Sequence, residues 1–508
     1  MSNFRKIIKT IGSSGLGFVV NILITLMLVP YITDLINAEA YGWVKVAKDT
    51  IVYCTMLTLA IRDFSTRYIG ISYHQEDYDE ADTYYSSVFF GETTLGLFIF
   101  CIAMIIVSGM ENYFQISPEL VADVKLLFLF TMLKFLQMTA FAVFECGPVI
   151  TNRMYIVGRF KLLSYIIEAA ALVFFYHFFS PHVYWVGLAL LLSSLVITVP
   201  NIVICGRYAD KLKISLSKFS IKAMGRMVGR GIWSSLNTIN NILNSGLDLL
   251  VANWILTPLR MGQLALVQSI SGIYTSVNSF ISPAFQPMIL ESYSRDDHHE
   301  TMRWFYLSMK ACSYFCSLFF AAFVVLGPAF YRLWVPHQDT ELLYRLTVIM
   351  IIPAITGGII TPMYYSYILT VSNRIPFFFS FFCGLLNVGS MVLLLSKTDL
   401  ELYAVVGTTA LFLVLNHLVA NGLYICYVLD EPRHIFYLNV LRCLAATGIM
   451  TGVFYSFNLL INASGWISLI VTGTFFAAIG ICIYTAFALN SSERDRILSL
   501  LKKKGGIA

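Results

Sequence analysis

The loop at 72–80 reads Ser-Tyr-His-Gln-Glu-Asp-Tyr-Asp-Glu, and the loop at 292–300 reads Ser-Tyr-Ser-Arg-Asp-Asp-His-His-Glu. Five of these nine positions match in residue or in charge when the sequence is shifted by 220 residues. The same shift places Gly42 on Gly262. Self-similarity at one fixed spacing indicates duplicated structural units. We therefore expect two homologous halves, with each loop following the second helix of its half.

The amino-acid composition indicates that these halves lie in a lipid membrane. The chain has 508 residues, of which 58% are hydrophobic and 12% charged, against roughly a quarter charged in soluble proteins. Mean hydropathy is +0.74. Apolar stretches long enough to span a bilayer occur at 11–34, 44–66, 85–109, 121–146, 161–180, 184–205, 230–256, 263–287, 304–326, 343–368, 376–396, 402–427, 438–459 and 466–489. The sequence thus predicts an all-α integral membrane protein with about fourteen transmembrane helices.

Charge distribution predicts the orientation of these helices. An even number of spans places both termini on one side, and all but eight of the 34 Lys and Arg residues fall on that side. The eight exceptions are Lys45, Lys48, Lys125, Lys134, Arg260, Arg332, Arg345 and Lys397. By the positive-inside rule both termini are cytosolic. The net charge of +5 is therefore explained by topology, and we expect no nucleic-acid partner.

The repeat also predicts the domain organisation. We expect an N-lobe at 1–206, a basic cytosolic linker at 207–229, a C-lobe at 230–430, and two extra helices with a cytosolic tail at 431–508. Six spans separate equivalent positions. This is an even number, so the two six-helix lobes have parallel topology and relate by a pseudo-two-fold axis along the membrane normal.

Polar residues line one side of the seventh predicted helix, 230–256. Arg230, Asn237, Asn241, Asn244 and Asp248 recur at helical spacing, which predicts one continuous polar face. The eighth helix starts a similar series at Gln268, and the second helix places Lys48 and Arg62 two heptads apart.

These polar faces have two interpretations. Ser, Thr and Asn also hold transmembrane helices together, so packing is the alternative to substrate binding. Packing does not require cations, however, whereas an interior that holds an anionic group does. We therefore assign eight candidate substrate-binding residues, namely Lys48, Arg62, Lys134, Arg230, Asn237, Asn241, Asn244 and Gln268.

Two ionisable residues face the membrane interior in consecutive helices. Lys134 and Glu168 lie near the middle of the fourth and fifth spans, where charged side chains are costly. One interpretation is a pair that only neutralises itself; the other is that Lys134 contacts the substrate while Glu168 titrates. Glu168 and Asp248 are therefore the candidate ion-coupling residues.

Several chemistries lack a sequence signal. The chain has no Gly-x4-Gly-Lys-Ser/Thr phosphate loop, which predicts no ATP hydrolysis. Its ten Cys are dispersed, so neither a metal site nor a disulfide framework is expected. We expect no cofactor and no catalytic residue. Transport must then be coupled to Na⁺, to H⁺, to the membrane potential or to later consumption of the product.

Local motifs resemble a known family. Tyr41-Gly42 follows the first helix, Asp248 and Gly262 match a pattern of the second half, and helix 8 ends in Ser282-Pro283 through Pro287. With the duplicated halves, the chain resembles the polysaccharide flippases (O-antigen, capsule and teichoic types) of the MATE-like multidrug/oligosaccharidyl-lipid/polysaccharide superfamily. Thr257 and Leu264 depart from the family pattern, as does Ile36-Asn37 where the family has Leu-Gly.

The resemblance implies a function. It implies a flippase that moves undecaprenyl-pyrophosphate-linked oligosaccharide across the bacterial cytoplasmic membrane by alternating access for surface polysaccharide synthesis, among membrane lipids and alongside polysaccharide polymerase machinery. A cation-coupled exporter of small molecules shares this fold, but is expected to have carboxylates and aromatics in its cleft. A membrane glycan polymerase is the enzyme alternative, and it typically carries a large extracytoplasmic loop, which this sequence lacks.

Overall fold

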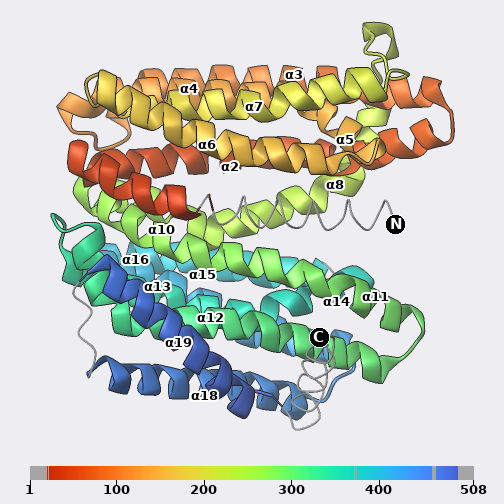
Figure 1. Cartoon of the computed structure of the whole chain (residues 1–508). Helices are drawn as coiled ribbons and strands as arrows, with labels where there is room; N and C mark the ends of the chain where they lie inside the picture. The colour runs from red at the N-terminus through yellow and green to blue at the C-terminus, as the bar shows by residue number, and fades with distance from the viewer. Residues whose placement is uncertain (1–19, 21, 371, 373, 460–464, 490–508) are drawn as a thin grey trace, which may run out of the picture. The chain divides into compact units, whose positions relative to one another are not determined.

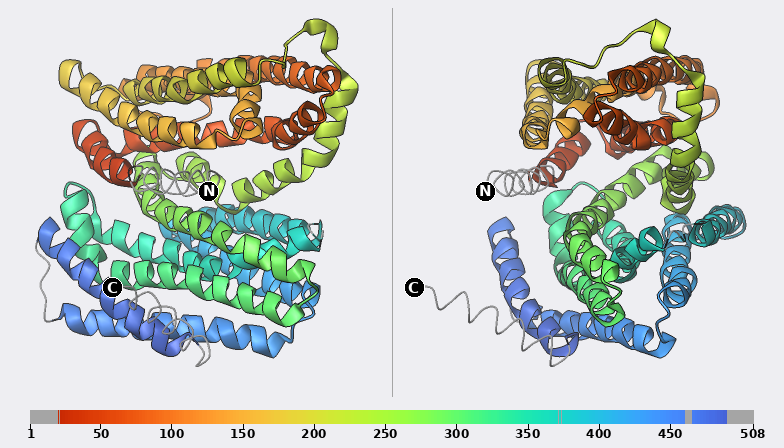
Figure 2. Two further views of the ribbon diagram at one scale, coloured as in Figure 1. Left: turned by 45° about the vertical axis from the view of Figure 1, so that its right-hand side comes forward. Right: turned by 90° about the vertical axis from the view of Figure 1, so that its right-hand side faces the viewer.

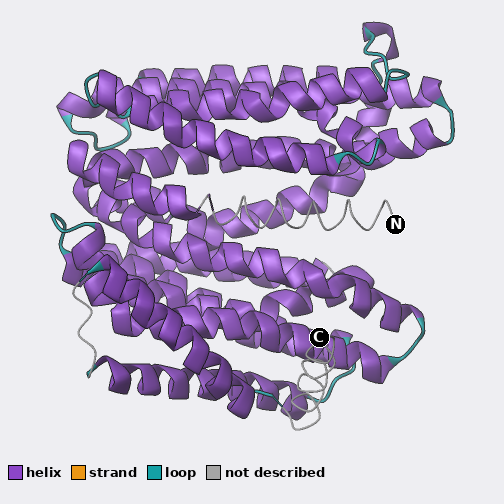
Figure 3. Ribbon diagram, viewed as in Figure 1, coloured by secondary structure: helices purple, strands orange, loops and turns teal. Residues whose placement is uncertain are grey.

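The computed structural model describes residues 20–489, with gaps at 21, 371, 373 and 460–464. The described part is helical, and no strand occurs in it (Figure 3). Residues 11–19 and Asn21 of the first predicted span, and the C-terminal lysines, lie outside the described residues.

The helices follow the order of the predicted spans. The first span continues as the helix Ile22–Leu35. The chain then passes through α2 (Ala38–His74), α3 (Tyr78–Ser108), η1 (Met110–Asn112), η2 (Pro118–Leu120), α4 (Val121–Ala140), η3 (Ala142–Glu145), α5 (Cys146–Ile150), α6 (Met154–Phe178), α7 (Tyr184–Tyr208), η4 (Leu216–Lys218), α8 (Ile221–Asn241), η5 (Ile242–Gly246) and α9 (Asp248–Ile255).

The chain continues through α10 (Pro258–Ile281), η6 (Ser282–Phe285), α11 (Gln286–Ser294), α12 (His298–Trp334), α13 (Thr340–Ile360), η7 (Thr361–Tyr364), α14 (Tyr365–Leu369), α15 (Arg374–Lys397), α16 (Leu402–Leu415), η8 (Asn416–Asn421), α17 (Gly422–Val428), α18 (Arg433–Asn458) and α19 (Trp466–Phe487). The expectation of an all-α protein with about fourteen transmembrane helices is confirmed.

Eight of the described helices are individually long and apolar enough to cross a membrane. A ninth span is the bent pair Pro118–Ala140 and Ala142–Ile150, which meets at 57°. The other spans are the partly described first helix and the helices rich in polar or charged side chains, namely α2, α6, α8 with α9, and α10. Polar residues are expensive in lipid, so these helices are where a functional interior is expected.

The 220-residue repeat is visible in the helix boundaries. α2 begins at Ala38 and α10 at Pro258, while α3 and α12 begin at Tyr78 and His298. In each repeat the residue before the N-cap of the latter pair has a positive φ, 61° in the first and 58° in the second. The N-cap is then an Asp in both, and its Oδ1 accepts from the amide three residues later at 3.0 Å in the first copy and 2.9 Å in the second. Such a cap fixes where a helix starts.

The two glycines that the repeat aligns lie against each other, Gly42 in α2 and Gly262 in α10. A Cβ on Gly42 would lie 3.0 Å from Gly262 Cα, and one on Gly262 would strike the Ala38 carbonyl group. Only a residue without a side chain permits this approach of the two backbones. Each glycine is the fifth residue of its helix.

Two compact units form, residues 1–266 and 267–508. In the first, α2 packs against α3, α4 and α8, and α4 and α6 pack against α7 (Figures 1 and 2). In the second, α12 is the central helix and packs against α13, α18 and α19. Its core includes fully buried Phe305, Phe436, Phe454 and Phe476. The lobe boundaries read from the sequence stay a prediction.

The linker at 207–229 is anchored within the first unit. Ser86 and Ser87 of α3 are fully buried, and their hydroxyls accept from the backbone amides of Ser215 at 3.0 Å and Ser220 at 2.9 Å. Satisfied backbone groups hold a loop in one conformation. The start of α8 is consequently fixed by α3.

Candidate functional site

The polar face of α2 carries two of the predicted cations. Lys48, Thr55 and Arg62 repeat every seven residues, so they share one side of the helix over ~21 Å. The Lys48 side chain is 45% exposed and that of Arg62 is 22% exposed. Each cation has acidic neighbours from other helices, and together they form two separate charged groups.

The first group joins α2, α4 and α6. Lys48 Nζ lies 3.9 Å from Glu168 Oε1, and Lys134 interacts electrostatically with both residues. The sequence predicted a Lys134 and Glu168 pair; the structure places them in a group of three. Two ammonium groups share one carboxylate, so the group has a formal excess of one positive charge. Such an excess in a partly dehydrated site favours an anionic ligand.

The second group surrounds Arg62. Its guanidinium donates to Glu145 Oε1 at 3.0 Å and to the Met138 carbonyl oxygen at 3.4 Å. Glu92 of α3 is 1% exposed and interacts electrostatically with both Arg62 and Glu145. Here two carboxylates surround one cation. With both carboxylates ionised, the group has a formal excess of one negative charge, the opposite of the first group. Neither Glu92 nor Glu145 was predicted from the sequence, although an acid inside an apolar span was a usable signal.

The predicted polar stripe of the seventh span divides into two parts. Asn237 and Asn241 of α8 are exposed, whereas Asn244 and Asp248 are 5% and 1% exposed. The π-helical turn η5 (Ile242–Gly246) follows Asn241, contains Asn244 and precedes Asp248. A π turn has more residues per turn than an α-helix, so residues after it are rotated away from the line extrapolated from α8. Asn237 and Asn241 remain available to a ligand, and Asn244 and Asp248 become interior.

The π turn is stabilised by its neighbours. Asn244 Nδ2 donates to the Asn240 carbonyl oxygen at 2.7 Å. The Tyr53 hydroxyl of α2 donates to the Gly246 carbonyl oxygen, and Tyr53 also interacts electrostatically with Asp248. Polar contacts at a break in a transmembrane helix satisfy backbone groups that lipid cannot. Asp248 therefore begins α9 at a structured break of the seventh span.

Arg230 and Gln268 have different surroundings. Arg230 is exposed on α8, and its guanidinium carbon lies 5.6 Å from the Tyr68 ring centroid of α2, a cation–π distance. Gln268 is 9% exposed on α10, and its backbone carbonyl oxygen accepts from the Ser271 hydroxyl at 3.1 Å. Gln268 belongs to the second unit.

A further polar group, not predicted from the sequence, lies within the second unit. It is centred on the π turn η8, where Asn421 Nδ2 donates to Asn416 Oδ1 at 2.9 Å. The Tyr367 hydroxyl donates to Asn421 Oδ1 at 3.0 Å, and His417 Nδ1 lies 2.9 Å from the Thr356 hydroxyl. The span formed by α8 with α9 and the span formed by α16 with α17 thus both contain a π turn next to buried Asn.

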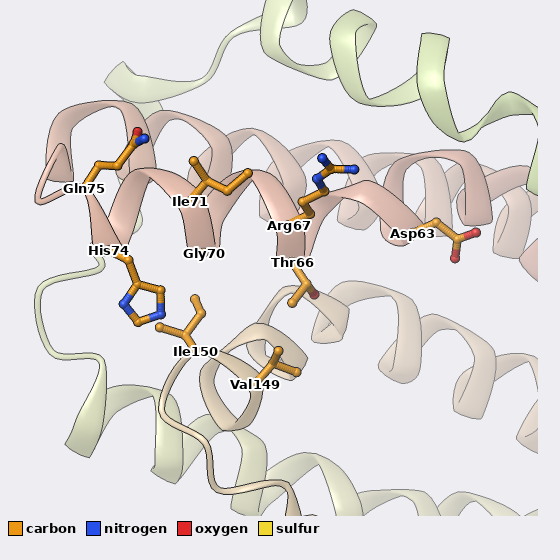
Figure 4. Close-up of a pocket in the computed structure, with 9 residues that line it drawn as sticks. All are labelled: Asp63, Thr66, Arg67, Gly70, Ile71, His74, Gln75, Val149 and Ile150. Atoms are coloured by element: carbon orange, nitrogen blue, oxygen red, sulfur yellow. The ribbon is translucent and has the colours of Figure 1, made fainter. Parts of the chain in front are cut away.

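A cavity of about 680 Å³ opens between the C-terminal half of α2 and α5. Figure 4 shows His74 and Thr66 directed toward Val149 and Ile150. The lining is completed by Asp63, Arg67, Gly70, Ile71 and Gln75. It mixes apolar and polar groups at the end of α2 that we predict to be cytosolic. No group of three or more His, Cys, Asp or Glu arranged to hold a metal occurs among the described residues.

No protein-family model matches the chain. An "Uncharacterized membrane protein EpsK" of Bacillus subtilis is 21% identical over 498 residues, covering 96% of this chain and 97% of that protein.

Solved structures agree on the architecture. The lipid II flippase MurJ, in an inward closed conformation, superposes with a TM-score of 0.63 and 16% identity, over 95% of this chain and 99% of MurJ. An inward-facing multidrug resistance MATE transporter of the MOP superfamily gives a TM-score of 0.66 and 12% identity, over 81% and 98% of the two chains. The chain therefore has the MurJ- and MATE-like MOP fold and is a multi-pass membrane protein. The expected MATE-like architecture is confirmed.

Proposed function

We propose that this chain is a transporter that moves a lipid-linked oligosaccharide, joined through pyrophosphate to a polyprenyl lipid, across the membrane. The observation that carries the proposal is the Lys48, Lys134 and Glu168 group. It supplies one more cation than carboxylate on a partly exposed interior face. Ammonium groups of this kind bind phosphate oxygens strongly where water is scarce. The likeness of the fold to the lipid II flippase MurJ supports a lipid-linked cargo.

The remaining polar residues have complementary roles in this proposal. Arg230, exposed on α8 and at cation–π distance from Tyr68, is assigned to a second phosphate. Asn237 and Asn241, exposed on the same helix, donate and accept hydrogen bonds as sugar hydroxyls require. Gln268 of the second unit has the same amide chemistry. Asn244, held inside the π turn, keeps this polar face in place.

Coupling to Na⁺, to H⁺ or to the membrane potential involves Glu168 or Asp248 in this proposal. Glu168 lies within the cationic group that receives the phosphates. Asp248 lies buried at the break of the seventh span, where a small change of helix geometry alters its exposure. Either carboxylate therefore links ion binding to the arrangement of the helices.

The same proposal places the protein in the bacterial cytoplasmic membrane with both termini cytosolic. The polysaccharide polymerase machinery is then the process that consumes the transported units. Moving the glycolipid neither makes nor breaks a covalent bond, so the protein acts as a transporter and not as an enzyme.

The Arg62 group favours a second candidate function, the export of small organic cations. When Glu92 and Glu145 are both ionised they outnumber Arg62, and this excess of carboxylate suits a cationic ligand. The two candidates differ in the charge of the cargo, which makes them separable in one reconstituted system.

The test uses purified full-length protein in liposomes that contain fluorescent undecaprenyl-pyrophosphate oligosaccharide. A membrane-impermeant glycosidase added outside reports how much glycan reaches the outer leaflet. We expect the accessible fraction to rise from about half toward completion with wild type. Lys48→Met should abolish this rise, whereas the control Glu341→Gln, at an exposed ion pair, should not. Transport of ethidium without glycan movement would favour the cation exporter instead.

A further inference from the structure

Glu92 is a buried carboxyl whose hydrogen-bonding capacity is not met. It lies in the middle of α3 and is 1% exposed. Its Oε1 atom has no hydrogen-bond partner among the described residues. An ionised carboxylate in such a site is strongly unfavourable unless a cation or donor compensates it. The surroundings of Glu92 therefore decide which form it takes.

The charged groups acting on Glu92 come from two elements. Arg62 of α2 attracts a negative charge there, and Glu145 of η3 repels it. Arg62 is already engaged, because it donates to Glu145 Oε1 and to the Met138 carbonyl oxygen of α4. The cluster thus has two carboxylates for one guanidinium.

Among the described residues, Arg62 and Glu145 are the charged groups that act on Glu92, and the charged residues of the other elements packed on α3 lie elsewhere along that helix. From α8, the apolar Met224 abuts Gly91, whereas the charged Arg226 contacts Tyr84 and Glu80 of α3, about two turns or more before Glu92. From η4, Lys218 pairs with Asp79 near the N-terminus of α3. The balance at Glu92 is therefore set by Arg62 and Glu145.

The structure assigns Glu92 as a proton-binding site whose occupancy is coupled to anion binding at Arg62. A proton on Glu92 neutralises the excess carboxylate and adds an O–H donor to the cluster. The route that we assign to that proton is Glu145, whose side chain is 49% exposed and which acts electrostatically on Glu92. The proton moves from water to a Glu92 oxygen, and no other bond changes.

Coupling follows from electrostatics. An anion that binds at Arg62 adds negative charge beside Glu92, which favours the protonated carboxyl. Linkage is reciprocal, so a protonated Glu92 strengthens anion binding by the same factor. This half of the inference rests on the proposed function, because it takes the phosphate group as the anion. The proton site itself depends only on the cluster geometry.

The experiment is infrared difference spectroscopy on the full-length protein in nanodiscs, which detects the carbonyl stretch of protonated carboxylic acids. Stepping from acid to alkaline pH should remove one buried-carboxyl band in wild type. Glu92→Gln should lack the band, Glu92→Asp should keep it with a shifted midpoint, and Glu341→Gln should match wild type. An unchanged band in Glu92→Gln, or no titrating band in wild type, would overturn the assignment.

Coupling is tested in the same samples with inorganic pyrophosphate. The midpoint of the Glu92 band should move to higher pH when pyrophosphate is present, and an unmoved midpoint would overturn the coupling. Replacing choline with Na⁺ at constant pH should leave the band intact; its loss would make Na⁺ the ligand and remove the proton assignment. None of these readouts measures glycan. A titrating band together with failed oligosaccharide transport would therefore reject the proposed function and leave the proton site standing.

Discussion

Lys48 Nζ of α2 lies 3.9 Å from Glu168 Oε1 of α6, with Lys134 of α4 in electrostatic contact with both. Glu168 thus compensates the charge of two lysines. Its loss leaves two uncompensated ammonium groups in one cluster, whereas loss of one lysine leaves a balanced pair. Effects on folding and effects on transport can therefore be measured separately. Folding depends on Glu168, which compensates the two lysines, whereas substrate binding depends on the lysines.

We expect Glu168→Gln to reduce the amount of inserted protein and Lys134→Met with Glu168→Gln to restore it, since the double variant keeps the wild-type excess of one positive charge. If Lys134 contacts the substrate, the double variant inserts but does not export glycan. Membrane abundance and surface glycan are measured together. An active double variant would remove both residues from the functional assignment.

Arg62→Ala and Arg230→Ala should each abolish glycan export while the protein still inserts. Loss of a charged, hydrogen-bonded contact in a desolvated site costs about 2 to 5 kcal/mol. Lys at either position should restore part of the activity, because it keeps the charge but not the planar fork. Surface glycan and membrane abundance are the measurements. Full activity of both Ala variants would show that neither guanidinium binds the substrate.

Gly231 allows α8 to approach α2 closely. A Cβ at Gly231 would collide with the Ala60 carbonyl group, whereas a Cβ at Gly229 has nothing within 4 Å. Gly231→Ala should therefore lower stability by about 1 to 3 kcal/mol through overpacking. Gly229→Ala should be neutral or slightly stabilising, because Ala favours helix. Fluorescence-detected thermal unfolding in detergent compares them, and equal stability of the two variants contradicts the close approach.

Tyr53→Phe removes the hydroxyl that donates to the Gly246 carbonyl oxygen at the π turn. A buried hydrogen bond contributes about 1 kcal/mol, so we expect a modest loss of thermal stability. Because Asp248 follows the turn closely, export should fall more than stability does. A matched control is Tyr113→Phe, at an exposed tyrosine in the loop after η1. If export and thermal stability fall in the same proportion, Tyr53 has only a structural role.

The predicted topology is tested by labelling single cysteines in a cysteine-free background. Lys218→Cys should react only from the cytosol, and Asn112→Cys or Gln338→Cys only from outside. Asn112 and Lys218 lie in the short 3-10 turns η1 and η4, outside the long helices. Labelling of positions 218 and 338 from the same side would contradict this topology. The C-terminal Lys503 is expected to be cytosolic, but lies outside the described residues.

Much of the fold was predictable because its signals are local and repeated. The loops at 72–80 and 292–300 indicated where helices end and begin, since an Asp N-cap works the same way in both copies. The charged partners were not predictable in this way. Lys48 and Glu168 lie far apart in the sequence and meet only through the folding of α2 beside α6.

The site was harder to predict where helix geometry departs from regularity. The prediction of one polar face from Asn237 to Asp248 assumed an uninterrupted α-helix. The π turn η5 breaks that regularity, and the second part of the face turns inward. The turn is held by a tertiary contact from Tyr53, which no spacing rule contains. Glu92 and Glu145 carried a signal, because each is an acid in an apolar span, yet only packing around Arg62 gives them a shared role.

The contact between Gly42 and Gly262 has a consequence for the history of the chain. Residues that are equivalent by duplication and adjacent in the fold correspond to a single position facing itself in a two-chain ancestor. In such an ancestor one codon would control both sides of the contact, and every substitution would count twice. In a single chain the two positions are coded separately, so equivalent positions can diverge in charge. By the same 220-residue shift, acidic Glu168 now corresponds to apolar Val388.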